Sequence, residues 1–371
     1  MTEPMSARDL SSTAAPGFGV YIHVPFCRHR CDYCAFATWT DKDGIMERYV
    51  DAVCTHIARE RAAGMAPADT VFVGGGTPTR LPDELLVRIL DALDIVPGAE
   101  VTVECNPDDV DEAMMRAYVA AGVSRVSIGV QSMVPSVLAA LGRTHDPDNV
   151  EAAVHAARAA GIGQVNLDLI YGGHGETLEN WRTTLERAIG LAPDHVSAYG
   201  LTVEAGTPLA ADTARHPDDD DLADKYTLAD DLLTAAGYGN YEISNWAKPG
   251  AECRHNRIYW SQGNYAAFGC AAHGHRDGRR WWTARTPERY IEMVERGEDP
   301  LGGEETLDAE TRAREALELA LRMRDGVPVG SFATVDLTGV LEGLVEPRGD
   351  RLVLTRRGRL LANEVSLRLR P

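Results

Sequence analysis

The chain lacks the features that would place it in a membrane or export it. Its longest apolar stretches fall far short of the roughly 18 residues that a spanning helix needs. The first segment, MTEPMSARDLSSTAAPGFG, has one arginine and no apolar core, so it does not resemble a secretory signal. We expect residues 1–17 to form a flexible tail, the chain to have no transmembrane segment and the protein to be cytoplasmic.

Positive charge is also scarce. There are 37 lysines and arginines against 56 acidic residues, which gives a net charge of −19. Nucleic-acid binding depends on cations that neutralise phosphates, so this composition disfavours a nucleic-acid partner. Only residues 346–371 depart from this balance, with seven arginines and three acids. This basic end could dock a partner or an anionic surface, although a solvated helix and strand edge is the simpler interpretation.

Short β-rich stretches alternate with helical patterns through the first half of the chain. Strands are expected at residues 19–24, 70–74, 101–104, 125–130, 165–170 and 195–201. Between them, apolar residues recur at helical spacing and predict helices at 45–57, 83–93, 111–121, 147–160 and 178–191. Repeated β/α units predict a parallel sheet with helices outside, and six units are fewer than the eight of a closed barrel. We therefore predict an α/β fold with a partial (β/α)6 barrel over residues 18–210.

The pattern changes after residue 210. Residues 211–305 are rich in aromatic and polar side chains, and we expect them to extend the barrel. Residues 306–371 predict a separate small module, with a helix over 313–321 and then a strand, a turn and a helix in RLVLTRRGRLLANEVSLRL. A winged-helix-like module would fit this order.

The chain has seven cysteines, but they do not form a familiar zinc pattern. Three lie in CRHRCDYC with the spacing C-x3-C-x2-C: Cys27, Cys31 and Cys34. No fourth follows, since the position two residues on is Phe36. A closed zinc site needs a fourth ligand, which His23 or His29 could supply, yet there is no second C-x2-C pair. A [4Fe–4S] cluster on three thiolates would instead leave one iron open to a small molecule.

Other polar residues fall at or near the predicted strand ends, where the chemistry of such barrels sits. The second strand runs into VFVGGGTPTR, whose glycines let the backbone approach a ligand. This sequence is neither a P-loop nor a G-x-G-x-x-G motif. The polar residues at these strand ends are Glu104, Gln131, Arg143 and Asp168. Polar side chains that are buried need hydrogen-bond partners, so these four together could bind a ligand.

These motifs resemble the radical SAM superfamily, in which the open iron of the cluster takes the amino and carboxylate groups of S-adenosylmethionine (SAM). The resemblance is to the branch that contains oxygen-independent coproporphyrinogen III dehydrogenase and the HemW-type heme chaperone. It covers roughly residues 18–371. It is carried by YIHVPFC, CDYC, GGGTPT, IGVQS, LGRTHD, NLDLIYG, HVSAYGLTVEAGTPL, YEISNWAKPG, HNRIYW and the basic end.

The resemblance implies a role for each matching residue. The [4Fe–4S] cluster would be held by Cys27, Cys31 and Cys34. Near the adenine would lie Tyr33, and the cluster-bound SAM would contact Tyr21, Gly75 and Glu104. A second SAM position known in this branch would be lined by Gly76, Thr77, Gln131, Arg143 and Asp168.

Two features separate the activities of this branch. The dehydrogenase typically has a further cysteine where this chain has Phe36, and the chaperones carry H-N-x-x-Y-W, here residues 255–260. The resemblance therefore implies a chaperone that binds heme and delivers it to acceptor hemoproteins. The alternative is the dehydrogenase. In it a reductant protein would supply electrons, and a radical derived from SAM would start the oxidative decarboxylation of coproporphyrinogen III.

The segment CRHNRIYW has side chains suited to heme. His255 is the first candidate for the axial ligand, because imidazole ligates heme iron. Tyr259 and Trp260 would offer flat apolar surface to the porphyrin. In the alternative interpretation, His255 and Asn256 cap a loop and the aromatic rings belong to the core. Further candidates for the ligand are Tyr259 itself, Cys253, Cys270 and His273.

Overall fold

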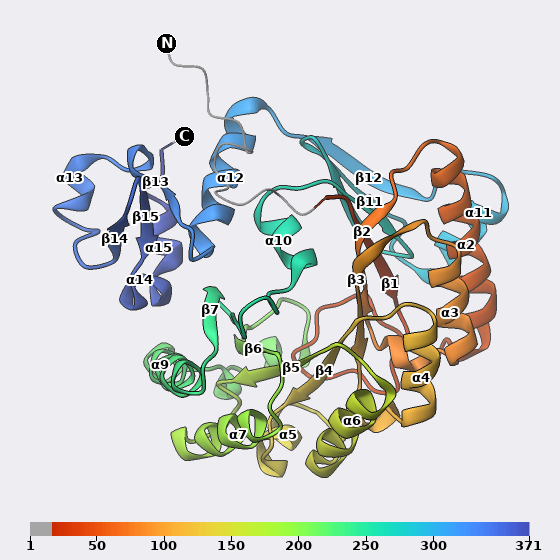
Figure 1. Cartoon of the computed structure of the whole chain (residues 1–371), viewed down its shortest axis with the longest axis horizontal. Helices are drawn as coiled ribbons and strands as arrows, with labels where there is room; N and C mark the ends of the chain where they lie inside the picture. Colours follow the sequence, from red (N-terminus) through yellow and green to blue (C-terminus); the bar gives the residue numbers. More distant parts are fainter. Residues whose placement is uncertain (1–16, 371) are drawn as a thin grey trace.

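The protein is described by a computed structural model over residues 17–370, so all of the predicted tail except Gly17 lies outside the described residues. Six parallel strands, each paired with the next, form the predicted partial barrel (Figure 1). They are β1 (Gly19–Val24), β2 (Ala68–Gly75), β3 (Ile95–Cys105), β4 (Arg125–Gln131), β5 (Gln164–Tyr171) and β6 (His195–Gly200). The predicted α/β class and (β/α)6 core are confirmed.

Helices cover the outside of these strands, as predicted. They are α2 (Met46–Ala62), α3 (Asp83–Asp91), α4 (Glu112–Ala120), the short α5 (Pro135–Ala140), α6 (Pro147–Ala160) and α7 (Leu178–Gly190). Local sequence fixes their ends. The side chains of Asp111, Asp146 and Thr177 accept hydrogen bonds from the first turns of α4, α6 and α7. Gly161 ends α6 in the left-handed conformation that glycine adopts without strain.

The two faces of the barrel strands differ in polarity. Outward residues such as Val73, Val103 and Leu167 are buried against the helices. Inward residues alternate with them and are often polar, for example Ser127 and Asn166, whose side chains hydrogen-bond at 2.6 Å. The barrel interior is therefore a network of buried polar groups, which hydrogen bonds must satisfy.

The segment after β6 adds strands to the sheet at both edges, while the expected bounds of the extension, residues 211–305, stay a prediction. The elements here are α8 (Pro208–Ala211), α9 (Asp219–Ala235), β7 (Gly239–Glu242), β8 (Asn245–Ala247), α10 (Arg254–Trp260), β9 (Tyr265–Phe268), β10 (His273–Arg276), β11 (Arg279–Thr283), α11 (Pro287–Glu295) and β12 (Leu301–Thr306). The twelve-stranded sheet has the order β12-β11-β10-β9-β1-β2-β3-β4-β5-β6-β8-β7.

Helix α10, which holds the HNRIYW sequence, lies at the starts of the barrel strands. The carboxylate of Glu100 on β3 accepts hydrogen bonds from the backbone N–H groups of Arg254 and His255, both at 2.9 Å. An anion at a helix N-terminus satisfies unpaired N–H groups and interacts favourably with the helix dipole. The helix therefore sits at the end of the barrel opposite to the carboxyl ends of the strands.

The last segment forms a small module with its own core. It contains α12 (Ala309–Arg322), β13 (Val327–Pro328), α13 (Thr334–Leu337), β14 (Val345–Arg348), β15 (Arg351–Leu354), α14 (Arg356–Leu360) and α15 (Ala362–Ser366). Its three-stranded sheet has the order β13-β15-β14. Figure 1 shows the module beside α9, and Arg359 of α14 pairs there with Asp230 at 2.8 Å. At least one arginine of the basic end therefore forms an ion pair within the protein. The likeness of the module to a winged helix stays a prediction.

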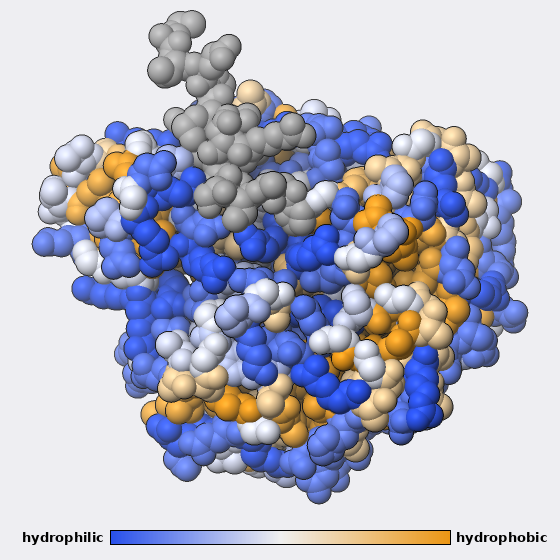
Figure 2. All heavy atoms as spheres, in the orientation of Figure 1, coloured by the Kyte–Doolittle hydropathy of each residue, from blue (hydrophilic) through white to orange (hydrophobic). Residues whose placement is uncertain are grey.

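The surface is largely hydrophilic on the face seen in Figure 2, where apolar side chains gather mainly over the helices around the barrel. Within residues 17–370, no helix combines the length and the apolar character needed to cross a bilayer.

Candidate functional site

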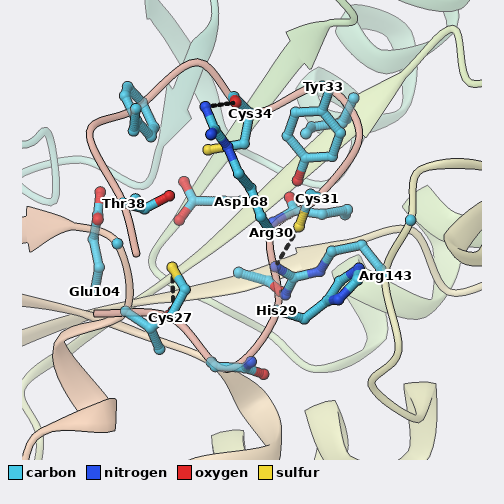
Figure 3. A pocket seen from close by; sticks show the side chains of 18 of the residues that line it. Cys27, His29, Arg30, Cys31, Tyr33, Cys34, Thr38, Glu104, Arg143 and Asp168 are labelled. Atoms are coloured by element: carbon cyan, nitrogen blue, oxygen red, sulfur yellow. Dashed lines mark hydrogen bonds between the residues drawn. The ribbon is translucent and has the colours of Figure 1, made fainter. Parts of the chain in front are cut away.

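A cavity of about 650 Å³ opens at the carboxyl ends of the barrel strands. Figure 3 shows the three cysteines around the same cavity as Glu104 and Asp168. Loops and strands far apart in the sequence meet here, as parallel barrels require. The cavity lining includes eleven residues predicted from the sequence: Cys27, Cys31, Tyr33, Cys34, Gly75, Gly76, Thr77, Glu104, Gln131, Arg143 and Asp168.

The cysteine loop is pinned at its base. The backbone N–H of Cys27 donates to Trp39 O at 3.0 Å, and the N–H of Trp39 donates to Pro25 O at 2.8 Å. Inside the loop, the N–H of Cys34 donates to Cys31 O at 3.1 Å. Burial, with the neighbouring thiols, raises the pKa of Cys27 and Cys34. Thiols crowded in this way ionise most readily when a cation binds them, which fits an iron–sulfur cluster.

A second observation fits a ligand in the same cavity. The hydroxyl of Thr38 is buried and makes no hydrogen bond of normal geometry within residues 17–370, although it lies close enough to the Cys27 thiol to lower the pKa of that thiol. By contrast, the suggested zinc ligand His23 is engaged: its Nδ1 pairs with the hydroxyl of Tyr21 at 3.1 Å and its Nε2 with Ala37 O at 2.9 Å. The other histidine suggested for zinc, His29, lies in the cysteine loop and lines the same cavity. Three thiols in one loop fit a [4Fe–4S] cluster with one open iron.

The glycine loop after β2 is packed against the cysteine loop. The N–H of Gly76 donates to Val24 O at 2.7 Å, and the N–H of Thr77 donates to Phe26 O at 2.8 Å. Gly75 has φ +115°, a conformation that side chains disfavour, and its N–H donates to the Glu104 carboxylate at 3.1 Å. This loop therefore has little room for a side chain.

A Gly76→Ala variant is expected to lose SAM affinity and cluster content together. An added Cβ would lie 2.7 Å from Phe26 O and 2.9 Å from Val24 O, so one loop must move. Overpacking of this kind costs about 1–3 kcal/mol. Thermal unfolding, iron analysis and SAM titration would measure the effect. Gly44→Ala is the control, because no atom of residues 17–370 lies within 4 Å of its added Cβ; equal losses in both variants would contradict the steric explanation.

Two carboxylates lie in the cavity wall. Burial, and secondarily repulsion from Asp168, raises the pKa of Glu104 to about 7. Burial also raises the pKa of Asp168, whose oxygens accept hydrogen bonds from Ser127 at 2.6 Å and Asn166 at 2.8 Å. A pair of buried carboxylates favours a cationic or hydroxyl-bearing ligand, because such a ligand compensates their desolvation.

Arg143 supplies the opposite charge. Its guanidinium donates to Gly129 O at 2.9 Å and to His145 Nδ1 at 3.3 Å, and it reaches Cys31 Sγ at 3.7 Å. Gln131 ends β4 with φ 53°, a left-handed conformation that is rare outside glycine. Carboxylates, an amide and a guanidinium can thus contact one ligand, as the sequence suggested.

Three residues that orient these groups were not predicted from the sequence. Ser127 and Asn166 hold Asp168, while His145 contacts Arg143. Asn166 lies two residues before Asp168 on β5, and Ser127 lies on the adjacent strand β4. Strand alternation places positions i and i+2 on one face. His145 lies two residues after Arg143 in the loop between α5 and α6. Applying that alternation to SIGVQS and NLDLIYG could have found the first two.

Tyr21 does not line the cavity. Its hydroxyl makes a hydrogen bond with the ring of His23, and its own ring stacks with Phe72 inside the barrel, farther from the carboxyl ends of the strands than the cavity. Its contact with SAM stays a prediction.

The predicted heme residues are not at the cavity either. His255 is fully buried, and its Nδ1 and Nε2 pair with Thr70 and Tyr259, both at 2.8 Å. Burial lowers the pKa of His255 to about 3. The guanidinium of Arg322 on α12 lies 4.4 Å from the ring centre of Trp260. In this arrangement His255 and Ile258 are buried, while the other side chains of HNRIYW are partly exposed.

Comparison with known proteins agrees with this geometry. The profile of the Radical SAM superfamily matches residues 21–188. The chain is 42% identical to the heme chaperone HemW of Mycobacterium tuberculosis, over 98% of this chain and 97% of that one. The chain belongs to the HemW family. Escherichia coli HemW is 34% identical over 91% of this chain and 90% of its own.

The HemW family assignment also accounts for the fold. The structure of coproporphyrinogen III oxidase HemN from E. coli, a radical SAM enzyme, superposes with a TM-score of 0.83. It covers 95% of this chain and 89% of that one at 22% identity, so the likeness concerns the fold. Membership of the radical SAM superfamily implies a [4Fe–4S] cluster and SAM, and the cavity residues fit both.

Proposed function

We propose that the chain is a heme chaperone, which binds heme and transfers it to acceptor hemoproteins. The observation that carries this proposal is the match over nearly the whole chain to relatives named as heme chaperones. Phe36 supports it, because this position holds an exposed phenylalanine where the dehydrogenase typically has a cysteine. The cytoplasmic location and a reductant protein as a second partner stay predictions from the sequence.

The cavity would serve the cluster and SAM. Bound there, the cluster would supply a coordination site and an electron for SAM. Cys27, Cys31 and Cys34 would ligate it, and Tyr33 would lie beside the adenine. The carboxylate of Glu104, oriented by Gly75, would attract the cationic part of SAM. A second SAM position would use Gly76, Thr77, Gln131, Arg143 and Asp168.

The predicted ligand His255 could reach heme iron only by giving up one of its two hydrogen bonds, because one ring nitrogen must bind the metal while the other can keep its partner. Leaving a buried donor or acceptor unpaired costs about 1–3 kcal/mol. Because His255 is also fully buried, ligation of heme iron by this residue requires a rearrangement around α10.

The proposal predicts stoichiometric heme binding without decarboxylation. Heme titrated into the anaerobically reconstituted protein should change the Soret band up to one equivalent. The same sample, given SAM, reductant and coproporphyrinogen III, should form no protoporphyrinogen IX. Absence of saturable heme binding would sink the chaperone proposal, while formation of protoporphyrinogen IX would establish the dehydrogenase instead.

A further inference from the structure

Hydrogen bonds inside the barrel continue from the cavity toward the opposite end of the strands. Asp168 accepts from the side-chain amide of Asn166 at 2.8 Å. The amide oxygen of Asn166 lies 2.6 Å from Nδ1 of His195 on β6, and Nε2 of His195 lies 2.9 Å from the hydroxyl of Tyr241 on β7. The backbone N–H of Cys253 donates to that hydroxyl at 3.3 Å. Cys253 directly precedes α10, so one chain of hydrogen bonds joins the cavity carboxylate to the HNRIYW helix.

The two ends of this chain fix its direction. A backbone N–H can only donate, and a carboxylate can only accept. Since the Tyr241 hydroxyl accepts from Cys253, its own hydrogen points at Nε2 of His195. The hydrogen of the neutral imidazole then lies on Nδ1 and points at the amide oxygen of Asn166. The amide nitrogen of Asn166 is left to face Asp168, so every hydrogen bond of the chain points toward the cavity.

The surroundings keep His195 in the form that this direction needs. The ring is buried, and burial, with a smaller effect of the Arg125 guanidinium, lowers the pKa of His195 well below its ordinary value. A protonated imidazole would carry hydrogens on both nitrogens, and one of them would oppose the hydroxyl hydrogen of Tyr241. Burial also raises the pKa of Tyr241, so the phenol keeps that hydrogen. The ring of His195 therefore has one donor and one acceptor, each matched to a partner.

The polarity of the cavity wall depends on this chain. Asn166 directs its amide hydrogens at the wall, to Asp168 and to the hydroxyl of Ser127 at 2.6 Å, which itself donates to Asp168 at 2.6 Å. An amide turned by half a rotation would place its oxygen against the carboxylate, and two acceptors repel each other. With the amide held as it is, Asp168 remains an acceptor for a hydroxyl group or a cation of a ligand.

We propose that His195 is a positioning residue for the cavity: it fixes the Asn166 amide and thereby keeps Asp168 available as an acceptor for a hydroxyl or ammonium group of SAM. That SAM is the ligand rests on the proposed function. The chain also gives a role to conspicuous stretches of the sequence. His195 begins HVSAYGLTVEAGTPL, Tyr241 lies in YEISNWAKPG, and Cys253 stands two residues before HNRIYW. These three stretches together support the cavity carboxylate from inside the barrel.

The test uses the full, anaerobically reconstituted chain, with SAM as the probe. His195→Phe keeps an aromatic ring of similar size but has neither donor nor acceptor. It should weaken SAM binding about tenfold, the effect of about one net hydrogen bond. His195→Gln keeps a donor and an acceptor on one planar group, so it should restore most of that affinity. Tyr241→Phe, which removes only the hydroxyl, should weaken SAM binding in the same direction as His195→Phe.

The matched control is His275→Phe. His275 is also buried, with Nδ1 paired to Gly263 O at 2.9 Å and Nε2 accepting from the Gly278 N–H at 3.1 Å. It thus has the same pattern of one donor and one acceptor, but it lies on β10, and its two partners do not line the cavity. This variant should lose thermal stability as His195→Phe does and should bind SAM like the parent.

Two further measurements separate positioning from a general loss of structure. In a double-mutant cycle, His195→Phe combined with Asp168→Asn should bind SAM no more weakly than Asp168→Asn alone, because the imidazole acts only through that carboxylate. Nitrogen NMR of the histidine rings in the parent should show His195 as the neutral tautomer with its hydrogen on Nδ1. This second measurement needs no variant, so it remains decisive if His195→Phe fails to fold.

The outcomes distinguish this assignment from the proposed function. A parent that binds SAM but no heme would contradict the chaperone function and leave the role of His195 standing. Equal SAM affinity in the parent and His195→Phe, equal losses in His195→Phe and His275→Phe, or additive losses in the cycle would overturn the positioning role alone. A hydrogen on Nε2 of His195 would overturn it as well. A parent that binds no SAM would contradict both the SAM position and the positioning role.

Discussion

A Cys31→Ser variant is expected to lose its iron–sulfur cluster. Cys27, Cys31 and Cys34 are the only thiols of the cysteine loop, and Phe36 occupies the position where a replacement could have stood. A serine hydroxyl is a much poorer ligand for iron than a thiolate. Since Cys31 is half-buried and accepts from Arg143, the smaller hydroxyl should fit without unfolding the loop. Iron, sulfide and the visible absorption of the reconstituted protein measure the loss.

The matched control for this prediction is Cys54→Ser. Cys54 lies on α2 away from the cavity, and its thiol donates to Arg88 O at 3.6 Å, a contact that a hydroxyl can keep. We expect this variant to retain full iron content. A Cys31→Ser protein with the iron and sulfide of the parent would contradict the cluster assignment, and zinc in place of iron in the parent would do so as well.

A Glu104→Gln variant should be more stable than the parent above neutral pH and should bind SAM more weakly. The pKa of Glu104 is about 7 in the folded chain against an ordinary value of 4.5. Between these pH values the unfolded chain is ionised and the folded chain holds the proton, so stability falls as pH rises through this window. At about 1.4 kcal/mol for each pKa unit, the loss is on the order of 3 kcal/mol. Glutamine removes this dependence.

The effect on SAM has the opposite sign. Ionised Glu104 attracts a cation, so SAM should bind the parent more tightly as pH rises through about 7. The variant should show weaker and flatter binding, since a charge-assisted hydrogen bond contributes about 1.5–3 kcal/mol. Thermal unfolding and SAM titration from pH 5 to pH 9 are the measurements. Glu112→Gln is the control, because Glu112 is an exposed partner of Arg116 and such pairs contribute little. A variant that follows the pH profile of the parent in both measurements would contradict the role of Glu104.

The barrel strands could be predicted because their sequences carry a local signal. The first strand was expected over residues 19–24, and β1 has those bounds. β3 begins at Ile95, earlier than expected. The sequence did not indicate this start, because IVPGAE contains proline and glycine, which are depleted in strands. The meeting of Cys27, Gly76 and Asp168 also followed from the sequence, since parallel strand ends share one edge of the sheet.

The extension could not be predicted in the same detail. Its strands are short, and β9 pairs with β1, which lies far away in the sequence. The position of α10 depends on Glu100 and Thr70, which lie more than a hundred residues before it in the chain and carry no local sign of this contact. The sequence predicted heme contacts for HNRIYW, and it carried no sign that His255 is buried with both ring nitrogens hydrogen-bonded.

The twelve-stranded order has a consequence for self-association. A six-stranded partial barrel alone would leave β1 and β6 as long apolar edges, whose unpaired peptide groups can recruit another chain. Here β9 pairs with β1 and β8 pairs with β6, so within the described part of the chain the free edges are β7 and β12. β12 is short and exposes Glu304 and Glu305. The open barrel thus ends in edges that resist strand-by-strand aggregation, even though its interior remains accessible at the cavity.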